Sequence, residues 1–291
     1  MIPPSFDYHV PNSVNDAVGM LKKYGSEAKI LSGGMSLIPL MKLRLAEPAH
    51  LIDINRISSL DQIEEADGFL TIGALVREAN LEKSVLIRSK YPLLLDTTLV
   101  IADPLVRNRA TIGGNLAHGD PANDHPATML ALEAELVLVG PQGERKIPVT
   151  GFFTDLFTTA LSSDEILIEI RIPIPPPGSV GAYFKLERKV GDFATAGVAV
   201  QLTVGKDDVC ERVGIGLTNV GVTPVKAEKA EDALRGKKID GESIKRAAQL
   251  AAQESAPTAD LRGSEEYKRD LVRVLTVRAL NRALERSRER K

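Results

Sequence analysis

Apolar residues of the N-terminal segment recur at helical spacing and then give way to an extended run. The helical positions are Val14, Ala17, Val18 and Leu21. Ser13 precedes them as a candidate N-cap and Gly25 follows where a C-terminal glycine is common, so a helix is predicted between the two. The apolar tetrapeptide AKIL comes next and runs directly into SGGMS. This pattern predicts a short strand that ends in a Gly-Gly turn.

The middle of the chain mixes extended and helical patterns. Strands are expected at LIDINRI (51–57), FLTIGALV (69–76) and EILIEIRIPI (165–174). Residues 79–101 have a helical pattern that Pro92 should break or kink. The segment PATMLALEAELVLVG (126–140) fits either a helix or a strand that leads into a hairpin.

The composition changes at PIPPPGS (173–179), where consecutive prolines predict an extended connector and a domain boundary. After it, strands are expected within residues 182–189, 195–205 and 213–227, and helices within 228–236, 243–254 and 265–287. The many Arg of the last helix are typical of a solvated face, with a partner-docking surface as the alternative. The chain is therefore predicted to be α+β, with a mixed domain of about 175 residues and a C-terminal sheet backed by helices.

Charge and cysteine content restrict the possible functions. The 291 residues carry a net charge of −2, which argues against nucleic acid or an anionic membrane as the main partner. No apolar run approaches the length of a membrane span, and the first ten residues lack the features of a signal peptide, which predicts a cytoplasmic protein. The single Cys210 excludes an internal disulfide and an iron–sulfur cluster held by this chain, and is expected to be a buried, inert thiol. Redox chemistry therefore requires a bound cofactor.

The polar segment ATIGGNLAHGDPANDHP (110–126) invites a metal site. Its candidate ligands are His118, Asp120, Asp124 and His125. Pro121 and Pro126 impose an irregular path, however, and no two His are spaced to share one face of a helix. His9 and His50 are distant in the sequence, so we expect no metal site in this chain.

Two Gly-Gly segments suggest a different ligand. The GxGxxG fingerprint of dinucleotide-binding folds is absent, and GIGLTN (214–219) fits a strand better. SGGMS (32–36) and TIGGN (111–115) instead form a pair of expected turns about 80 residues apart. Glycines that adopt positive φ bring successive N–H groups close to an anion. From the residues alone, the pair either clamps the two phosphates of a dinucleotide or consists of two tight turns.

The residues 28–57 (AKILSGGMSLIPLMKLRLAEPAHLIDINRI) together with ATIGGNLAHGDPANDHPATMLAL resemble the flavin-binding medium subunits of the molybdenum hydroxylases. This family includes carbon monoxide dehydrogenase, whose pattern is the most similar, and the flavin domain of xanthine dehydrogenase. The resemblance covers essentially the whole chain. It implies a two-subdomain FAD-binding domain of the vanillyl-alcohol-oxidase-like (PCMH) type, residues 1–175 with subdomains of about 1–57 and 58–175. A carbon monoxide dehydrogenase flavoprotein C-terminal domain would occupy 176–291.

The resemblance also implies a set of cofactor-binding residues. One phosphate-side loop comprises Ser32, Gly33, Gly34, Met35 and Ser36, and the other comprises Thr111, Ile112, Gly113, Gly114 and Asn115. Asp124 would meet the ribose hydroxyls, Leu161, Lys185, Ile101 and Ala102 would lie near the cofactor, and Phe193 would cover the flavin ring. No catalytic side chain is implied, because FAD carries the chemistry.

Four residues around these loops have expectations of their own. Met35 stands where the carbon monoxide enzymes commonly have His in GGHS, so the imidazole is replaced by a thioether that can pack on the flavin. Asp103 and Arg107 are expected to form a local ion pair or to seat the loop. Arg107 or Arg109 is a candidate for contact with the pyrophosphate.

By resemblance, the chain is an electron-transfer subunit with two partners. A large molybdopterin subunit would oxidise the substrate, and a small subunit with two two-iron–two-sulfur clusters would pass electrons to FAD. FAD would pass them to a quinone, NAD or oxygen, and the complex would be a dimer of three-subunit units, a heterohexamer. The alternatives are a stand-alone flavin reductase, identified by turnover with NAD(P)H without partners, and a scaffold subunit that has lost its flavin.

Overall fold

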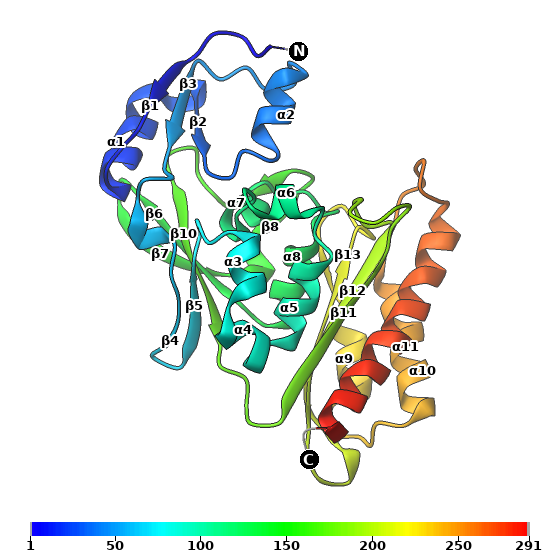
Figure 1. Cartoon of the computed structure of the whole chain (residues 1–291). Coiled ribbons are helices and arrows are strands. Elements are labelled where there is room, and N and C mark those ends of the chain that lie inside the picture. The colour runs from blue at the N-terminus through cyan, green and yellow to red at the C-terminus, as the bar shows by residue number, and fades with distance from the viewer. Residues whose placement is uncertain (1, 290–291) are drawn as a thin grey trace.

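The computed structural model describes residues 2–289, and its N-terminal end forms a small parallel sheet (Figure 1). The strand order is β1-β3-β2, with β1 at Asp7–His9, β2 at Ala28–Leu31 and β3 at His50–Asp53. The helix α1 (Val14–Tyr24) packs on this sheet, and α2 (Leu37–Lys42) follows β2. The predicted caps are confirmed, because the Ser13 side chain accepts from the N–H of Asp16 and Gly25 has a φ of 55°. Strand AKIL is also confirmed.

A second, antiparallel sheet with the order β4-β5-β10-β6-β7 forms the body of this half of the chain. Its strands are β4 (Ile63–Ala66), β5 (Phe69–Gly73), β6 (Glu135–Gly140), β7 (Gly143–Pro148) and β10 (Ile166–Pro173). A hairpin of β8 (Phe153–Asp155) and β9 (Thr158–Thr159) lies between β7 and β10 in the chain. The helices that accompany this sheet are α3 (Glu78–Lys83), α4 (Val85–Lys90), α5 (Pro92–Leu99), α6 (Pro104–Arg107), α7 (Ile112–Ala117) and α8 (Asp124–Ala131).

Two ambiguous segments of the sequence are settled by these elements. Pro92 breaks the helical pattern as expected and becomes the first residue of α5, where its missing N–H costs nothing. The segment 126–140 contains both alternatives in succession, since α8 ends at Ala131 and β6 begins at Glu135.

The C-terminal half is an antiparallel sheet in the order β11-β12-β13-β14, with helices on both faces. Its elements are β11 (Ser179–Leu186), β12 (Ala196–Val204), β13 (Cys210–Thr218), β14 (Val225–Lys226), α9 (Glu228–Leu234), α10 (Gly241–Glu254) and α11 (Glu265–Glu289). Helices α9 to α11 cover one face, and α5 and α8 of the N-terminal half cover the other (Figure 1). The α+β prediction is confirmed. Cys210 is fully buried on β13, where burial raises the pKa of its thiol to about 11, as an inert thiol requires.

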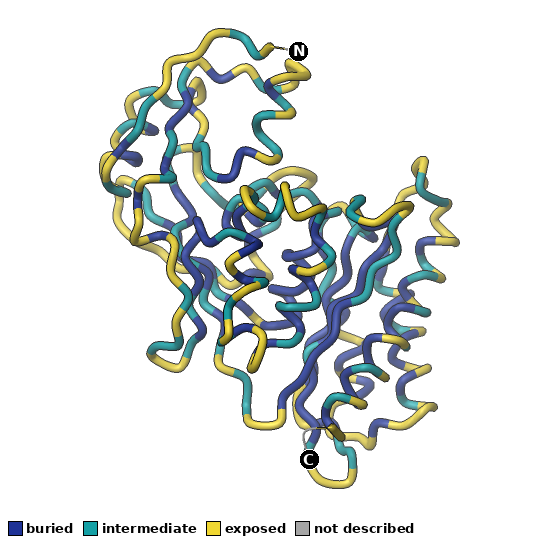
Figure 2. Tube along the Cα trace, in the orientation of Figure 1, coloured by how far each residue is buried: buried dark blue, intermediate teal, exposed yellow. Residues whose placement is uncertain are grey.

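Glycines allow α5 and α8 to lie directly on this second face. A Cβ at Gly216 would overlap the carbonyl oxygen of Ala127 on α8 and lie 2.7 Å from the carbonyl carbon. Gly214 faces the backbone of Ala131 in the same way, and a Cβ at Gly181 would lie 2.7 Å from the Leu93 side chain on α5. Figure 2 shows the result as buried backbone through the strands and the two helices. The two halves of the chain are therefore joined by close backbone packing.

The long helix α11 reinforces this joint. Arg286 donates to both carboxylate oxygens of Asp96 on α5, at 2.6 and 2.9 Å, and also to the carbonyl oxygen of Gly181. Other arginines of α11 pair within the helix, such as Arg273 with Asp270 at 2.7 Å. Among residues 2–289, no helix combines the length and the apolar character that crossing a membrane demands.

We predict that Gly216→Ala destabilises the folded chain, because its methyl group has no space against α8. The expected loss is about 1–3 kcal/mol, the usual range for overpacking a close contact. Gly19→Ala is the matched control, since Gly19 lies within α1 and a Cβ there meets nothing within 4 Å. That control should gain roughly 0.5–1 kcal/mol from helix propensity. Thermal denaturation of both variants provides the test, and equal stability of G216A and the unchanged chain would contradict the packing described here.

Candidate cofactor site

The two Gly-Gly segments, distant in the sequence, meet in the fold. Ser32 follows β2, Thr111 precedes α7, and their hydroxyl oxygens lie 3.2 Å apart. Gly33 packs against the backbone of Arg109 and Ala110, just before Thr111. The expectation that SGGMS and TIGGN act on one ligand therefore has the necessary geometry.

The glycines serve a different purpose from the one expected. Only Gly34 has a positive φ, of 76°, among the four glycines of the two segments. Gly33 is required because a Cβ there would overlap the carbonyl oxygen of Arg109, and Gly113 because a Cβ would lie 2.6 Å from the carbonyl oxygen of Ala74. TIGGN is also not a turn, since Thr111 caps α7 and both of its glycines lie within that helix. The sequence could not distinguish glycine for close approach from glycine for positive φ.

The backbone N–H groups of the two segments also differ in their hydrogen bonds. The N–H groups of Ile112 and Gly113 donate to the carbonyl oxygens of Val76 and Ala74, both at 3.1 Å. That of Gly114 donates to the Thr111 hydroxyl, also at 3.1 Å. The SGGMS segment differs, because within residues 2–289 we find no acceptor for the four N–H groups of residues 33–36. Gly33 and Gly34 are moreover buried. Buried N–H groups without a protein partner are rare, so these groups are available as donors to a ligand.

A cavity adjoins the contact between the two segments. Its lining includes Ser32, Gly113, Gly114 and Leu161. Apolar residues complete the wall, among them Ile30, Ile54, Ala74 and Ala117. Next to Gly114, the side-chain oxygen Oδ1 of Asn115 is buried without a partner. The lining thus combines Ser32 of SGGMS, two glycines of TIGGN and Leu161 with apolar walls, and it also includes Glu165.

A network of hydrogen bonds between polar side chains holds the SGGMS segment in place. The amide nitrogen of Asn55 donates to the carbonyl oxygen of Ser32 at 2.9 Å and to Asp53 Oδ1 at 2.6 Å. The Tyr8 hydroxyl donates to the other oxygen of Asp53. Arg77 donates to Asn55 Oδ1 and to the Arg109 carbonyl oxygen, so it links both segments. The sequence analysis missed this network, although LIDIN covers the end of β3 and carries two polar side chains, Asp53 and Asn55.

The arginines near TIGGN differ from expectation. Asp103 caps α6 by accepting from the N–H of Val106 at 2.9 Å, so it forms no ion pair with Arg107. Arg107 pairs instead with Glu82 at 3.0 Å and donates to the carbonyl oxygen of Ile101 at 3.1 Å. An N-cap carboxylate is already committed to backbone donors, so of the two expected roles Arg107 has the second, which is to seat the loop. Arg109 has no ion pair in the described part of the chain.

Asp124 and Lys185 form the second half of the candidate site. The Asn123 side chain donates to the Asn115 carbonyl oxygen at 2.8 Å, which places the start of α8 beside α7. Asp124 accepts from the Tyr183 hydroxyl at 2.7 Å and from Lys185 Nζ at 3.0 Å. Burial raises the pKa of Asp124, and the Lys185 ammonium opposes that rise. Both oxygens of Asp124 thus have partners, and a ribose would use their second lone pairs.

Tyr183 was missed, although AYFKLERK contained the signal. Tyr183 and Lys185 are two residues apart on β11 and therefore point to the same face. Burial, with the adjacent Asp124 carboxylate, raises the pKa of Tyr183 well above its ordinary value, so its hydroxyl remains a donor.

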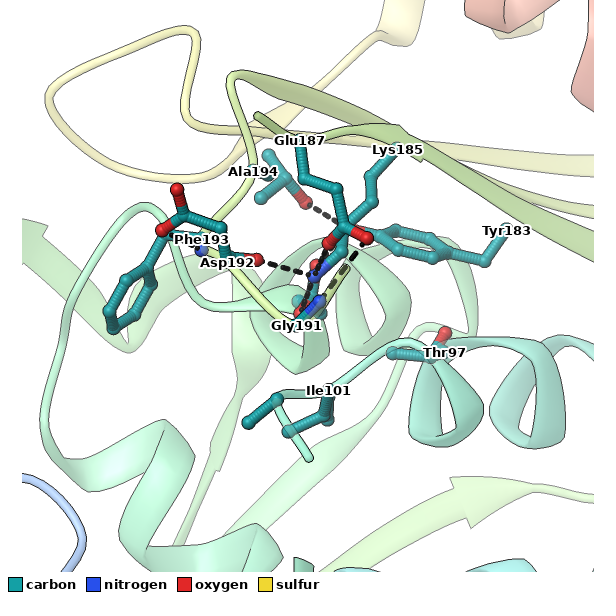
Figure 3. Close-up of polar contacts among 12 residues, drawn as sticks. Thr97, Ile101, Tyr183, Lys185, Glu187, Gly191, Asp192, Phe193 and Ala194 are labelled. Carbon is teal, nitrogen blue, oxygen red and sulfur yellow. Dashed lines mark hydrogen bonds and ion pairs between the residues drawn. The ribbon is translucent and has the colours of Figure 1, made fainter. Parts of the chain in front are cut away.

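Lys185 also fixes the loop that follows β11 (Figure 3). Its ammonium donates to the Asp192 carbonyl oxygen at 3.1 Å, and the Asn219 amide donates to that of Ala194 at 2.6 Å. Gly191, with a φ of 83°, lies against Ala102, where a Cβ would be 2.9 Å from the carbonyl oxygen. The loop therefore adjoins Ile101 and Ala102. Phe193 is 49% exposed, and its ring points away from Lys185 and Tyr183 (Figure 3).

The remaining residues of the predicted site have simple environments. His125 is fully buried and its Nε2 lies 2.8 Å from Glu78 Oε2, while the His118 ring packs beside Phe157. His125 is thus a buried hydrogen-bonding residue of α8. Met35 exposes 37% of its surface next to the unpaired N–H groups.

Comparisons with known proteins show the family of the chain. Residues 4–175 match the model of the FAD binding domain in molybdopterin dehydrogenase, and residues 181–283 match that of the CO dehydrogenase flavoprotein C-terminal domain. The carbon monoxide dehydrogenase medium chain of Hydrogenophaga pseudoflava is 47% identical over 97% of this chain and 98% of its own length. The 6-hydroxypseudooxynicotine dehydrogenase complex subunit alpha of Paenarthrobacter nicotinovorans is 38% identical, over 100% of this chain and 98% of its own.

Solved structures show the same relationship. Carbon monoxide dehydrogenase from Hydrogenophaga pseudoflava superposes with a TM-score of 0.96 at 48% identity, over 98% of this chain and 99% of that one. Quinoline 2-oxidoreductase from Pseudomonas putida gives a TM-score of 0.93 at 31% identity, over 99% of both chains. With both halves matched, this chain belongs to the family of FAD-binding flavoprotein subunits of the molybdopterin dehydrogenases, in which the FAD-binding domain is followed by the CO dehydrogenase flavoprotein C-terminal domain.

Proposed function

We propose that this chain carries FAD and transfers electrons within a molybdenum-containing dehydrogenase, with the pyrophosphate held by the N–H groups of residues 33–36. The observation that carries the proposal is the absence of protein acceptors for these four groups, two of which are buried. A diphosphate supplies several strong acceptors within the span of such a segment. Asn115 and the Ser32 and Thr111 hydroxyls supply further polar atoms at the same place.

Arg109 is the cation we assign to the pyrophosphate. Its backbone packs against Gly33, and its guanidinium has no ion pair within residues 2–289. Arg107, the other candidate, is already paired with Glu82. An arginine that has no ion pair in the described residues and whose backbone adjoins Gly33 complements the charge of a diphosphate.

The flavin end of the cofactor is assigned to the second half of the site. Leu161 lines the cavity beside Gly114, and Asp124 lies at the start of the neighbouring α8, where it is proposed to meet the ribose. The loop that Lys185 holds presents Phe193 as the cover of the ring. When bound, FAD supplies the ability to accept two electrons and to release them, and this chain binds, orients and shields it.

The partners are proposed from the names of the relatives, and the acceptor is proposed as a class of molecule. Relatives are named as medium chains or subunits of dehydrogenase complexes. We propose that this chain receives electrons from a small iron–sulfur subunit, which a large molybdopterin subunit supplies, in a dimer of three-subunit units. A quinone, NAD or oxygen would take the electrons from FAD. A stand-alone flavin reductase remains the alternative, and turnover of NAD(P)H by the isolated chain would favour it.

The purified chain is expected to be yellow and to release about one equivalent of FAD on denaturation. One equivalent is expected because residues 33–36 form one proposed pyrophosphate-binding segment in each chain. Absorbance of the released flavin, quantified against protein, provides the measurement. A colourless chain that takes up no added FAD would contradict the proposal and would favour the alternative of a scaffold subunit that has lost its flavin.

Gly114→Asp is expected to abolish FAD retention. The new carboxylate would lie between Ser32 and Thr111, whose hydroxyls are 2.8 and 2.7 Å from the position of a Cβ at Gly114. Those neighbours are side-chain ends that can move, so the fold should persist. Gly114→Asn is the matched control because it adds the same bulk without the charge, and it should keep more flavin than G114D. Unchanged flavin content in G114D, at a melting temperature equal to that of the cofactor-free chain, would exclude this contact as the pyrophosphate site.

Lys185→Met is expected to cost about 3–5 kcal/mol at neutral pH, since it leaves the Asp124 carboxylate buried without its cation. The pKa of Asp124 is already raised by burial, and losing Lys185 raises it further. The folded variant then binds a proton more readily than the unfolded chain. Its stability should therefore recover as the pH falls from the raised pKa towards the ordinary carboxyl pKa of about 4.

The double variant Asp124→Asn, Lys185→Met serves as the control. It removes the buried charge, so most of the lost stability should return and the pH dependence should disappear. Melting temperatures measured across this pH range decide the matter. If K185M loses the same stability at every pH, the Lys185–Asp124 pair does not act through charge.

A further inference from the structure

Three side chains on one face of the N-terminal sheet converge away from the cofactor site. Asp7 and His9 belong to β1 and are two residues apart, so they point to the same face. In the parallel register Asp7 pairs with His50 on β3, which adds a third side chain to that face. One ligand atom from each residue lies within 4.8 Å of the other two. The sequence concealed this group because 41 residues separate the two histidines.

The distances within the group fit a tetrahedral metal ion. His9 Nε2 lies 3.2 Å from His50 Nδ1, which lies 3.6 Å from Asp7 Oδ2. Ligands at zinc–nitrogen and zinc–oxygen distances of about 2.0–2.2 Å in a tetrahedron are separated by roughly 3.3–3.5 Å. The third separation, between His9 and Asp7, is at most 4.8 Å, and rotation of Asp7, whose side chain is 76% exposed, would shorten it.

Hydrogen bonds alone cannot pair all the polar atoms of this group at once. His50 Nδ1 is a single atom that faces both His9 Nε2 and the Asp7 carboxylate. In a neutral ring it carries either one proton or one lone pair, so it completes a hydrogen bond to one neighbour only. A cation at the centre of the three atoms would engage the lone pairs of all of them at once.

Tyr24 holds both imidazoles in place. Its ring stacks on His50 with centroids 3.9 Å apart and on His9 with centroids 4.9 Å apart. The Tyr24 hydroxyl accepts from Lys23 Nζ at 3.1 Å, so the phenol is itself restrained. Ligands that are held before binding lose less entropy when the ion arrives. The partly open position beside Asp7 leaves room for a water as fourth ligand.

We propose that Asp7, His9 and His50 bind a divalent transition ion of the zinc type, independently of FAD. Two imidazoles and one carboxylate are the donor set that zinc takes in open sites, whereas magnesium and calcium prefer oxygen ligands throughout. The ion would fasten β1 to β3. Tyr8, between two of the ligands, reaches Asp53 and through Asn55 the Ser32 carbonyl, so the same fastening would steady the SGGMS segment.

The test uses the full chain with its flavin, stripped of metal by a chelator that is then removed. Equilibrium dialysis against micromolar Zn²⁺, with metal analysis, should give about one equivalent bound. His9→Gln and His50→Gln should lower the affinity by more than the roughly 10–100-fold that loss of an outer-shell partner costs. His118→Gln is the matched control, because His118 lies elsewhere beside Phe157, and it should bind zinc like the unchanged chain.

A second measurement on the unchanged chain guards against variants that fail to fold. Co²⁺ added to the metal-free protein should produce the intense visible bands of a four- or five-coordinate site, and zinc should displace them. Zinc should also raise the melting temperature of the unchanged chain and of H118Q, but not of H9Q. No zinc bound at micromolar concentration, or equal binding by the unchanged chain and both ligand variants, would overturn the proposal. Flavin content is recorded in parallel, so failure of this site is distinguishable from failure of the FAD assignment.

Discussion

The site depends on close backbone contact between two segments that lie far apart in the sequence. Gly33 packs on the carbonyl of Arg109, and Gly113 packs on Ala74, with no space for a Cβ at either position. These contacts bring Ser32 to Thr111, and the N–H groups of Ile112, Gly113 and Gly114 are bonded within the protein. The N–H groups of SGGMS are then the donors left for a ligand. The asymmetry between two similar motifs is therefore a consequence of packing.

Glycines in close contact with a neighbouring backbone also join the two halves of the chain. Gly214 and Gly216 of β13 admit α8, whose first residue is Asp124. Because α8 lies so close, Tyr183 and Lys185 of the C-terminal sheet reach the Asp124 carboxylate. Lys185 in turn fixes the loop after β11 that contains Phe193. The packing of the sheet thus determines where the proposed flavin cover stands relative to the phosphate end of the site.

Local patterns were sufficient for much of the fold and for the identity of the motifs. Caps at Ser13 and Gly25, the break at Pro92 and the strand AKIL follow from short-range chemistry, and each is confirmed. The role of the glycines could not be predicted from the sequence. A position that needs positive φ and a position that has no space for a Cβ both require glycine. Pairings such as Arg107 with Glu82 depend on the tertiary fold and cannot be inferred from neighbours such as Asp103. Tyr183 was within reach, since it alternates with Lys185 on a predicted strand.

The central claim is that the N–H groups of residues 33–36 hold the FAD pyrophosphate while those of TIGGN do not. Amide NMR of the chain, recorded without and with FAD, tests it most directly. The account predicts that the amide proton signals of Gly33 and Gly34 move strongly downfield, as expected for new bonds to an anion, while Gly113 and Gly114 change little because their N–H groups are already bonded. Large downfield shifts at Gly113 and Gly114, with none at Gly33 and Gly34, would contradict it.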